Sequence, residues 1–392
     1  MSKIKNKLLV AFIMVSLIPL VILGSYGLLN ISKSLESSSV EKLEGQVSSF
    51  SSGITEFLKN VSTDLFYLRD SSSLHLLIES NPLSSQSAIR GLQSDFLAFS
   101  EHKKIYNQIR FLDPDGMEIV RVDRKLGKST IITGDKLQNK KKRYYFVDTI
   151  DLAKGQLMIS PLDLNRENGK VERPRRPVIR YGTPVFDKDN VLKGIVLFNV
   201  QADNFLDLLR QKETRGNQLY FADPKGFYYI NPDPTKEWGG PADLDTGFNI
   251  KKDFPDTASL LIETKTTKNI SHGEHIVVAT PVFLDTEKEK MLGVIVNVAQ
   301  TKDVFSSVIT FRNMFLLLGG IVFLSTLIIA IGLAKSITTP LLHLTEITSN
   351  MSKGKLGTPV NITTKDEIKL LGDSIERLRK SMVILLKRST KR

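Results

Sequence analysis

The sequence predicts an α+β membrane protein that has two transmembrane helices and a duplicated α/β domain between them. Two uncharged stretches, residues 8–30 and 313–334, are each long enough to cross a bilayer core of about 30 Å. Three short phrases recur between these stretches, in the same order and about a hundred residues apart. Two apolar heptad segments follow the second stretch. Together these patterns predict a duplicated domain outside the membrane, two membrane spans and a helical module.

The distribution of lysines predicts how the chain crosses the membrane. Lys3, Lys5 and Lys7 lie in residues 1–7, before the first span, and Lys335 follows the second span. Because basic residues favour the cytoplasmic side, we expect both termini in the cytoplasm and the intervening domain in the periplasm or outside the cell. This topology is typical of a two-pass protein of the bacterial inner membrane. A cleaved signal peptide is the alternative for the first stretch, although no clear small-x-small cleavage site follows it.

Composition narrows the possible chemistry. The chain has no cysteine, which excludes a disulfide framework and a thiolate metal site. Its formal charge is +12, but the basic residues form no single helical stripe and many are predicted to lie outside the membrane. We therefore expect no nucleic-acid partner, no metal and no cofactor.

Residues 31–104 are predicted to form a long stalk helix and a helical lead-in. Apolar residues recur there mostly at spacings of four and three, which places them on one helix face. They are Leu43, Val47, Phe50, Ile54, Phe57, Val61, Leu65 and Leu68. This stripe predicts contact with a dimer partner, with the chain's own domain, or with both.

From Ile105 the pattern changes to short β-rich runs, and it does so twice. The segments 106–112 and 117–123 flank an Asp-Pro-Asp-Gly turn that is typical of a hairpin. Three phrases return in order: residues 111–116 at 221–226, residues 183–186 at 280–283, and residues 194–200 at 293–298. Three ordered matches predict two copies of a small α/β unit, residues 105–212 and residues 213–312.

Specific phrases in these copies resemble the double Cache sensor family. They are Arg143-Tyr-Tyr-Phe146, Ser160-Pro-Leu-Asp-Leu-Asn165, Pro177-Val-Ile-Arg180 leading into Thr183-Pro-Val-Phe, and Asn231-Pro-Asp-Pro-Thr-Lys-Glu-Trp238. The resemblance covers roughly residues 40–311. It implies two PAS-like lobes stacked above the membrane, with the ligand pocket in the membrane-distal lobe, which is the first copy.

The first copy also contains a basic stretch. Residues 124–180 hold fifteen Lys or Arg against six Asp or Glu. Arginine matches a carboxylate bidentately and aromatic walls exclude water, so we expect a small anionic ligand such as an organic acid. The candidate ligand-binding residues are Arg143, Tyr145, Phe146, Asp163, Arg180 and Asn199. Structural ion pairs are the alternative for the two arginines.

The resemblance also suggests which ligand class fits. In the amino-acid-sensing branch of the family, an Asp on the last strand holds the ligand's ammonium group. Asn199 stands at that position here, and it offers only a neutral oxygen. An organic acid without an amine therefore fits better than an α-amino acid. Trp238, Tyr228 and Tyr229 of the second lobe are interpreted as core residues.

Residues 335–386 follow the second span and precede a short tail, residues 387–392. Their two heptad segments are expected to run in the same direction, joined by a connector that runs back along them, and Pro340 is expected to open the first helix. This arrangement resembles a HAMP domain. Its signature residues here are Pro340, Gly354, Leu356, Val360 and Glu367. An amphipathic helix held on the lipid surface is the alternative.

The features combine into one functional hypothesis. The chain is expected to be a homodimeric receptor that binds an extracytoplasmic ligand and signals to a separate cytoplasmic protein, in chemotaxis or a two-component system. No nucleotide, hydrolase or zinc-protease motif appears, so the chain itself is not expected to be an enzyme. Two alternatives remain: the sensory front of a histidine kinase or cyclic-dinucleotide enzyme, and an envelope scaffold that binds another protein.

Overall fold

The computed structural model describes residues 3–80, 86–167, 169–211, 217–272, 274–285 and 290–389. Contacts divide the chain into two compact units, which are described separately. One unit is residues 36–304, and the other combines residues 1–35 with residues 305–392. Helix α1 (Lys3–Arg69) contributes to both units.

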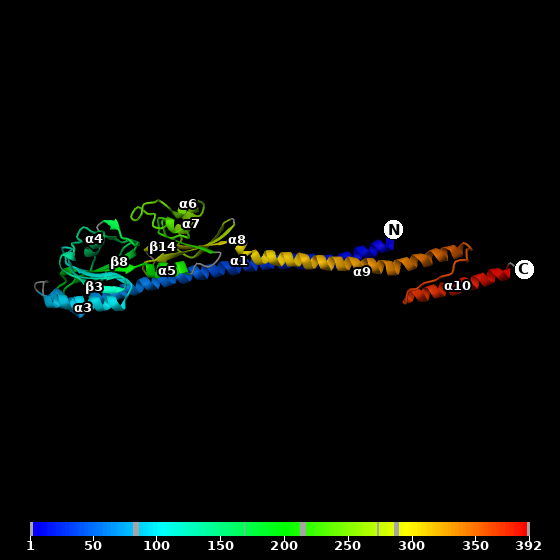
Figure 1. Ribbon diagram of the computed structural model, residues 1–392, viewed down its shortest axis with the longest axis horizontal. Helices are drawn as coiled ribbons and strands as arrows, with labels where there is room; N and C mark the ends of the chain where they lie inside the picture. Colours follow the sequence, from blue (N-terminus) through cyan, green and yellow to red (C-terminus); the bar gives the residue numbers. More distant parts are fainter. Residues whose placement is uncertain are drawn as a thin grey trace. The chain divides into compact units, whose positions relative to one another are not determined.

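Within the unit formed by residues 36–304, α1 packs against the chain's own sheets (Figure 1). Helices α2 (Ser72–Glu79) and α3 (Gln86–His102) follow it. The predicted stripe is largely buried: Val47, Val61 and Leu65 have no exposed surface. This heptad stripe therefore serves the chain's own domain.

The first lobe contains a seven-stranded antiparallel sheet in the order β3-β2-β1-β9-β8-β4, with β5 paired to β8, among the described residues. Its strands are β1 (Tyr106–Leu112), β2 (Glu118–Lys125), β3 (Lys128–Ile132), β4 (Met158–Ile159), β5 (Asp163–Leu164), β8 (Pro177–Phe186) and β9 (Leu192–Gln201). A small hairpin is formed by β6 (Arg166–Glu167) and β7 (Lys170–Val171). The helices of this lobe are η1 (Gly134–Lys136), α4 (Tyr144–Ile150) and α5 (Asp203–Gln211).

The second lobe contains a five-stranded antiparallel sheet in the order β11-β10-β14-β13-β12 in the described part of the chain. Its strands are β10 (Asn217–Ala222), β11 (Tyr228–Ile230), β12 (Lys268–His272), β13 (His275–Phe283) and β14 (Met291–Gln300). The short helices are η2 (Pro234–Lys236), α6 (Ile250–Asp253), α7 (Ala258–Ile262) and α8 (Thr301–Val304).

The predicted duplication is confirmed by the order of the strands. The run β2-β1-β9-β8 of the first lobe has the same order as β11-β10-β14-β13 of the second. Gly194 and Gly293 occupy matching places at the starts of β9 and β14. A Cβ at Gly194 would lie 2.0 Å from the Leu112 carbonyl oxygen, and one at Gly293 would lie 2.2 Å from that of Ala222. The repeated glycine thus permits the same close approach of two strands in each lobe.

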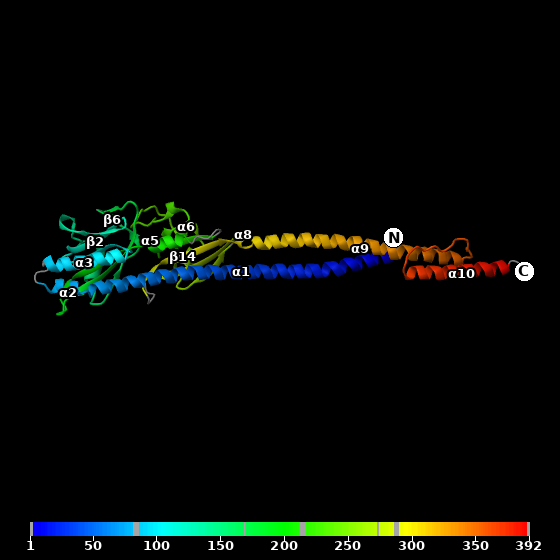
Figure 2. The ribbon, with the colours of Figure 1, turned by 60° about the horizontal axis from the view of Figure 1, so that its bottom comes forward.

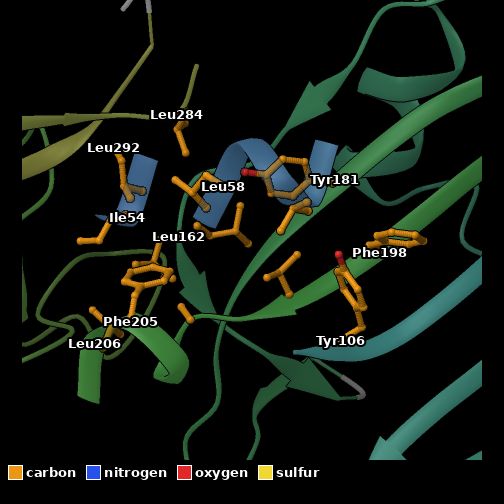
Figure 3. Close-up of a cluster of buried hydrophobic side chains, with 14 of the residues drawn as sticks. Ile54, Leu58, Tyr106, Leu162, Tyr181, Phe198, Phe205, Leu206, Leu284 and Leu292 are labelled. Atoms are coloured by element: carbon orange, nitrogen blue, oxygen red, sulfur yellow. The ribbon is translucent and has the colours of Figure 1, made fainter. Parts of the chain in front are cut away.

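The two lobes and α1 share one hydrophobic core. Figure 3 shows Ile54 and Leu58 of α1 beside Leu162 of the first lobe and Leu284 and Leu292 of the second. All five side chains are at least nine-tenths buried. Burial of one such side chain contributes about 1.5–3 kcal/mol, so this cluster resists separation of the lobes.

The other unit contains two helices that are long and apolar enough to cross a membrane, the first part of α1 and α9 (Ser306–Ser352). They lie side by side in Figures 1 and 2. At their contact, a Cβ on Gly24 would lie 2.1 Å from the ring of Phe315, so the missing side chain makes room for this aromatic ring.

The end of α9 and helix α10 (Glu367–Ser389) run in the same direction, and residues 353–366 connect them (Figure 2). Leu344 and Met351 of α9 pack with Val360 and Ile362 of the connector. Gly354 has a φ of +81°, which glycine adopts readily at a helix end. The parallel helices and returning connector are as predicted.

One detail of the prediction was wrong. Pro340 does not open a helix, because it lies inside the continuous helix α9. Proline removes one backbone hydrogen bond, but helical residues on both sides hold the segment together, as happens in membrane-associated helices. The span and the first heptad segment therefore form one uninterrupted rod.

Candidate functional site

A row of buried polar residues crosses the sheet of the first lobe. Arg180 of β8 pairs directly with Asn199 of β9, Asn199 with Gln108 of β1, and Gln108 with Asp123 of β2. Residues that lie opposite each other in antiparallel strands share a face, so all four project to the same side. Each is more than nine-tenths buried. Such a row in a sheet core needs polar partners, which the covering elements supply.

Helix α4 covers this polar face, and α1 and α3 pack on the opposite, apolar face (Figure 1). Phe146 of α4 is buried against Leu112, Ile195 and Leu197 of the sheet. A Cβ on Gly182 would lie 2.4 Å from the Thr149 hydroxyl oxygen, so glycine at this position lets α4 approach the sheet closely. The predicted residue Phe146 is thus part of the packing that holds α4 in place.

Arg110 lies at the centre of the polar face and is only 2% exposed. Its Nη2 donates a hydrogen bond of 2.6 Å to Asn199 Oδ1, and its Nη1 lies 3.5 Å from the Tyr145 hydroxyl oxygen. Glu118 Oε1 is 3.6 Å from Arg110 Nη1, and the other oxygen of Glu118 lies 3.3 Å from Arg121 Nη1. The buried Nε of Arg110 has no hydrogen-bond partner among the described residues.

Three guanidinium groups surround the ring of Tyr145. Arg110, Arg143 and Arg180 place their guanidinium carbons 5.3, 5.7 and 5.5 Å from its centroid. Burial raises the pKa of Tyr145, but the positive charges of Arg110 and Lys140 outweigh burial and lower its pKa below the ordinary value of 10.0. The environment of this hydroxyl is therefore strongly positive.

The two predicted arginines have different partners. Arg180 Nη1 lies 2.7 Å from Asp163 Oδ1, and Asp163 Oδ2 accepts a hydrogen bond of 3.2 Å from the Tyr144 hydroxyl. Arg143, directly before α4, is half-buried. Its guanidinium makes no ion pair or hydrogen bond to any residue that the structure describes. The positive charge of Arg143 is thus available to an anion.

The structure brings Arg143, Tyr145, Asp163, Arg180 and Asn199 together beneath or beside α4. The sequence interpretation missed members of this cluster that lie outside the basic stretch or were assigned to solvent: Arg110, Glu118, Arg121 and Lys140. A signal was present, because Gln108 and Arg110 stand two residues apart in the predicted strand and must share one face. In total, five basic side chains and three carboxylates (Glu118, Asp123 and Asp163) meet on this face, which leaves it positive.

Comparison with family models gives two matches. Residues 59–296 match the model for the bacterial histidine kinase sensor domain, and residues 332–383 match the HAMP domain. Neither is a catalytic domain. No curated protein matches the chain.

Solved structures with the same fold are sensory domains. The extracellular domain of a protein described as the histidine kinase vpHK1S-Z8 is 21% identical with a TM-score of 0.59, over 70% of this chain and 95% of that one. A domain of a sensory box/GGDEF family protein from Vibrio parahaemolyticus is 20% identical with a TM-score of 0.59, over 68% and 98%. The periplasmic sensory domain of the Campylobacter jejuni chemoreceptor Tlp1 is 12% identical with a TM-score of 0.50, over 69% and 98%. The predicted fold class is confirmed.

Proposed function

Because this chain belongs to the family of bacterial histidine kinase sensor domains, we propose that its first lobe binds a small anionic molecule, most simply an organic acid, beneath α4. A sensor domain, two candidate membrane helices and a HAMP domain together fit a transmembrane sensor receptor. The ligand changes the packing of the first lobe, and this change passes through the spans to the HAMP helices.

The observation that carries the proposal is the positive cluster around Tyr145. Arg110 and Arg180 are partly neutralised by Glu118 and Asp163, but Arg143 has no acidic partner in the described part of the chain. A carboxylate would gain a charge-assisted hydrogen bond from Arg143 and would relieve repulsion among the guanidinium groups. Asn199 is already engaged by Arg110 and Gln108, which supports a ligand without an ammonium group.

Signal relay in this proposal requires a homodimer. Leu371, Leu378 and Leu385 of α10 are 46%, 53% and 65% exposed in the single chain, although they are spaced by heptads. A groove of about 460 Å³ between α9 and α10 is lined by Leu341, Leu344 and Leu371 among others. The same helices of a second protomer would cover this apolar face and complete a parallel four-helix bundle. A shift of that bundle would be read by a separate cytoplasmic signalling protein.

Ligand binding can be tested on the full chain in lipid nanodiscs by thermal denaturation with acetate, lactate and succinate. A ligand at a hundred times its dissociation constant should add about 2.7 kcal/mol to the free energy of unfolding. Arg143→Ala should remove the stabilisation, because the one arginine without an acidic partner in the described cluster is lost. A panel of carboxylates that leaves the melting temperature unchanged would contradict the proposal.

Arg90→Ala is the matched control. Arg90 is an exposed arginine of α3, on the other side of the same sheet, and its Nε donates a hydrogen bond of 3.2 Å to the Gln86 carbonyl oxygen. This variant changes the net charge by the same amount, so it should keep the full response to the carboxylate. An equal loss in both variants would attribute the effect to net charge and remove Arg143 from the site.

A further inference from the structure

A cleft lies between the two lobes and shares Asp163 with the polar face beneath α4. Its volume is about 820 Å³, at the upper end of the range of small-molecule sites. Residues 158–163 of the first lobe form one wall, and residues 223–243, Leu284 and residues 290–292 of the second lobe contribute to the other. A molecule in this cleft would contact both lobes at once.

Carboxylates from both lobes line the cleft. They are Asp148 and Asp163 of the first lobe and Asp223 and Asp243 of the second. Asp243 Oδ1 accepts a hydrogen bond of 2.8 Å from the Leu164 N–H, and Asp223 Oδ1 accepts bonds from the Lys225 and Phe227 N–H groups. Neither Asp223 nor Asp243 forms an ion pair with a described residue. Their negative charges are therefore held in place but not neutralised by a partner.

Among the described residues that line the cleft, four carboxylates stand against two lysines, Lys225 and Lys290. The pKa of Asp243 is raised to about 6, chiefly by burial and also by the carboxylates of Asp163 and Asp223, while the Leu164 N–H and the cationic Arg166 act to lower it. Lys225 and Lys290 also line the cleft, but both are exposed. Exposed ammonium groups are screened by water, whereas a cation inside the cleft would be held closer to the carboxylates.

A second, independent feature is a polar side chain that has no partner. Tyr229 is 5% exposed and lines the cleft, yet its hydroxyl makes no hydrogen bond to any described residue. Burial raises the pKa of Tyr229, and the negative charges of Asp223, Asp243 and Asp163 raise it further. The ring of Trp238, another lining residue, lies 5.4 Å from the ring of Tyr229. The hydroxyl of this mostly buried side chain therefore remains available to a ligand in the cleft.

We infer that the interlobe cleft is a second ligand site, which binds a small organic cation such as an aliphatic amine. Asp223 and Asp243 would neutralise the ammonium group, Tyr229 would accept a hydrogen bond from it, and the aromatic rings would pack against its alkyl chain. Because Asp163 and Asp243 come from different lobes, the bound cation would interact with both lobes at once.

The single tryptophan of the chain is Trp238, so its fluorescence reports directly on this cleft. The full chain in lipid nanodiscs is titrated with 1,4-diaminobutane at pH 7.5, with 1,4-butanediol as the neutral control of the same length. We expect a saturable fluorescence change with the diamine and none with the diol. No saturable change with the diamine, or an equal change with the diol, would overturn the inference.

Substitutions then locate the site. Asp243→Asn keeps an oxygen for the Leu164 N–H but removes the charge, and it should weaken diamine binding about tenfold or more. Tyr229→Phe should weaken binding by a smaller factor. Asp189→Asn, at an exposed turn of the first lobe, is the matched control and should bind as the unmodified chain does. Unchanged affinity in Asp243→Asn, with secondary structure preserved by circular dichroism, would also overturn the inference.

Discussion

The surroundings of the Asp243 carboxyl group predict how the free energy of unfolding depends on pH. Its pKa is raised from 3.8 to about 6, chiefly by burial and also by Asp163 and Asp223. In the unfolded chain this group loses its proton near pH 4, whereas in the folded chain it holds the proton until about pH 6. The folded state binds more protons in this window, so the free energy of unfolding falls as the pH rises from about 4 to 6.

A shift of about two pKa units corresponds to at most about 3 kcal/mol at neutral pH, and because Asp243 is partly exposed we expect about 1–3 kcal/mol. Asp243→Asn removes the charge while an amide oxygen can still accept from the Leu164 N–H. The variant should therefore be more stable than the unmodified chain at pH 7.5. This difference in stability should be smaller at pH 5 and absent at pH 3.5.

The measurement is urea denaturation followed by Trp238 fluorescence across this pH range. Asp189→Asn serves as the control, because its side chain lies at an exposed turn. If the higher free energy of unfolding of Asp243→Asn persisted unchanged at pH 3.5, the electrostatic reasoning would be refuted and a change in packing would be the cause. Equal stability of the two chains at every pH would mean that the carboxyl group is not desolvated.

Two further predictions concern the backbone and the HAMP helices. Gly194→Ala should lower the free energy of unfolding by about 2–4 kcal/mol, because its Cβ would lie 2.0 Å from a backbone oxygen. In the same urea titration, Gly45→Ala should raise the free energy of unfolding by up to about 1 kcal/mol, because Gly45 occupies an open helical position. The chain has no cysteine, so Leu378→Cys, on the exposed heptad face, should form a disulfide-linked dimer in membranes much faster than Lys380→Cys on the opposite face of α10, as read by non-reducing electrophoresis. Equal cross-linking of the two variants would contradict a dimer through the heptad face.

The sequence predicted the architecture well because the architecture rests on periodic patterns. Leu43 to Leu68 recur with the helix period, and the buried side of α1 is the one that this period specifies. The duplicated phrases lie at matching places because the same close strand contact, at Gly194 and Gly293, needs the same residue in both lobes. Patterns of this kind can be recognised in a sequence because the position of each residue in them has a local steric cause.

The candidate site was only partly predictable, since its members meet through strand pairing and not through proximity in the sequence. Arg110 and Asn199 are 89 positions apart but share a hydrogen bond. Net charge directed attention to residues 124–180, whereas Arg110 and Glu118 precede that stretch. The prediction that Pro340 opens a helix was wrong because it considered only the local preference of proline for helix starts. The membrane span already supplies a helix on the N-terminal side of Pro340.

Asp163 connects the anion site proposed for the first lobe with the cation site proposed for the cleft. Its Oδ1 lies 2.7 Å from Arg180 Nη1, and the same residue lines the interlobe cleft. A cation in the cleft would attract the Asp163 carboxylate. This carboxylate would then neutralise Arg180 less, so the positive potential around Tyr145 would increase. Saturating 1,4-diaminobutane should then raise the affinity for a stabilising carboxylate about fivefold, and the carboxylate should raise diamine affinity by the same factor. Asp163→Asn should remove this reciprocity, and a diamine that binds without changing carboxylate affinity would show that the two sites act independently.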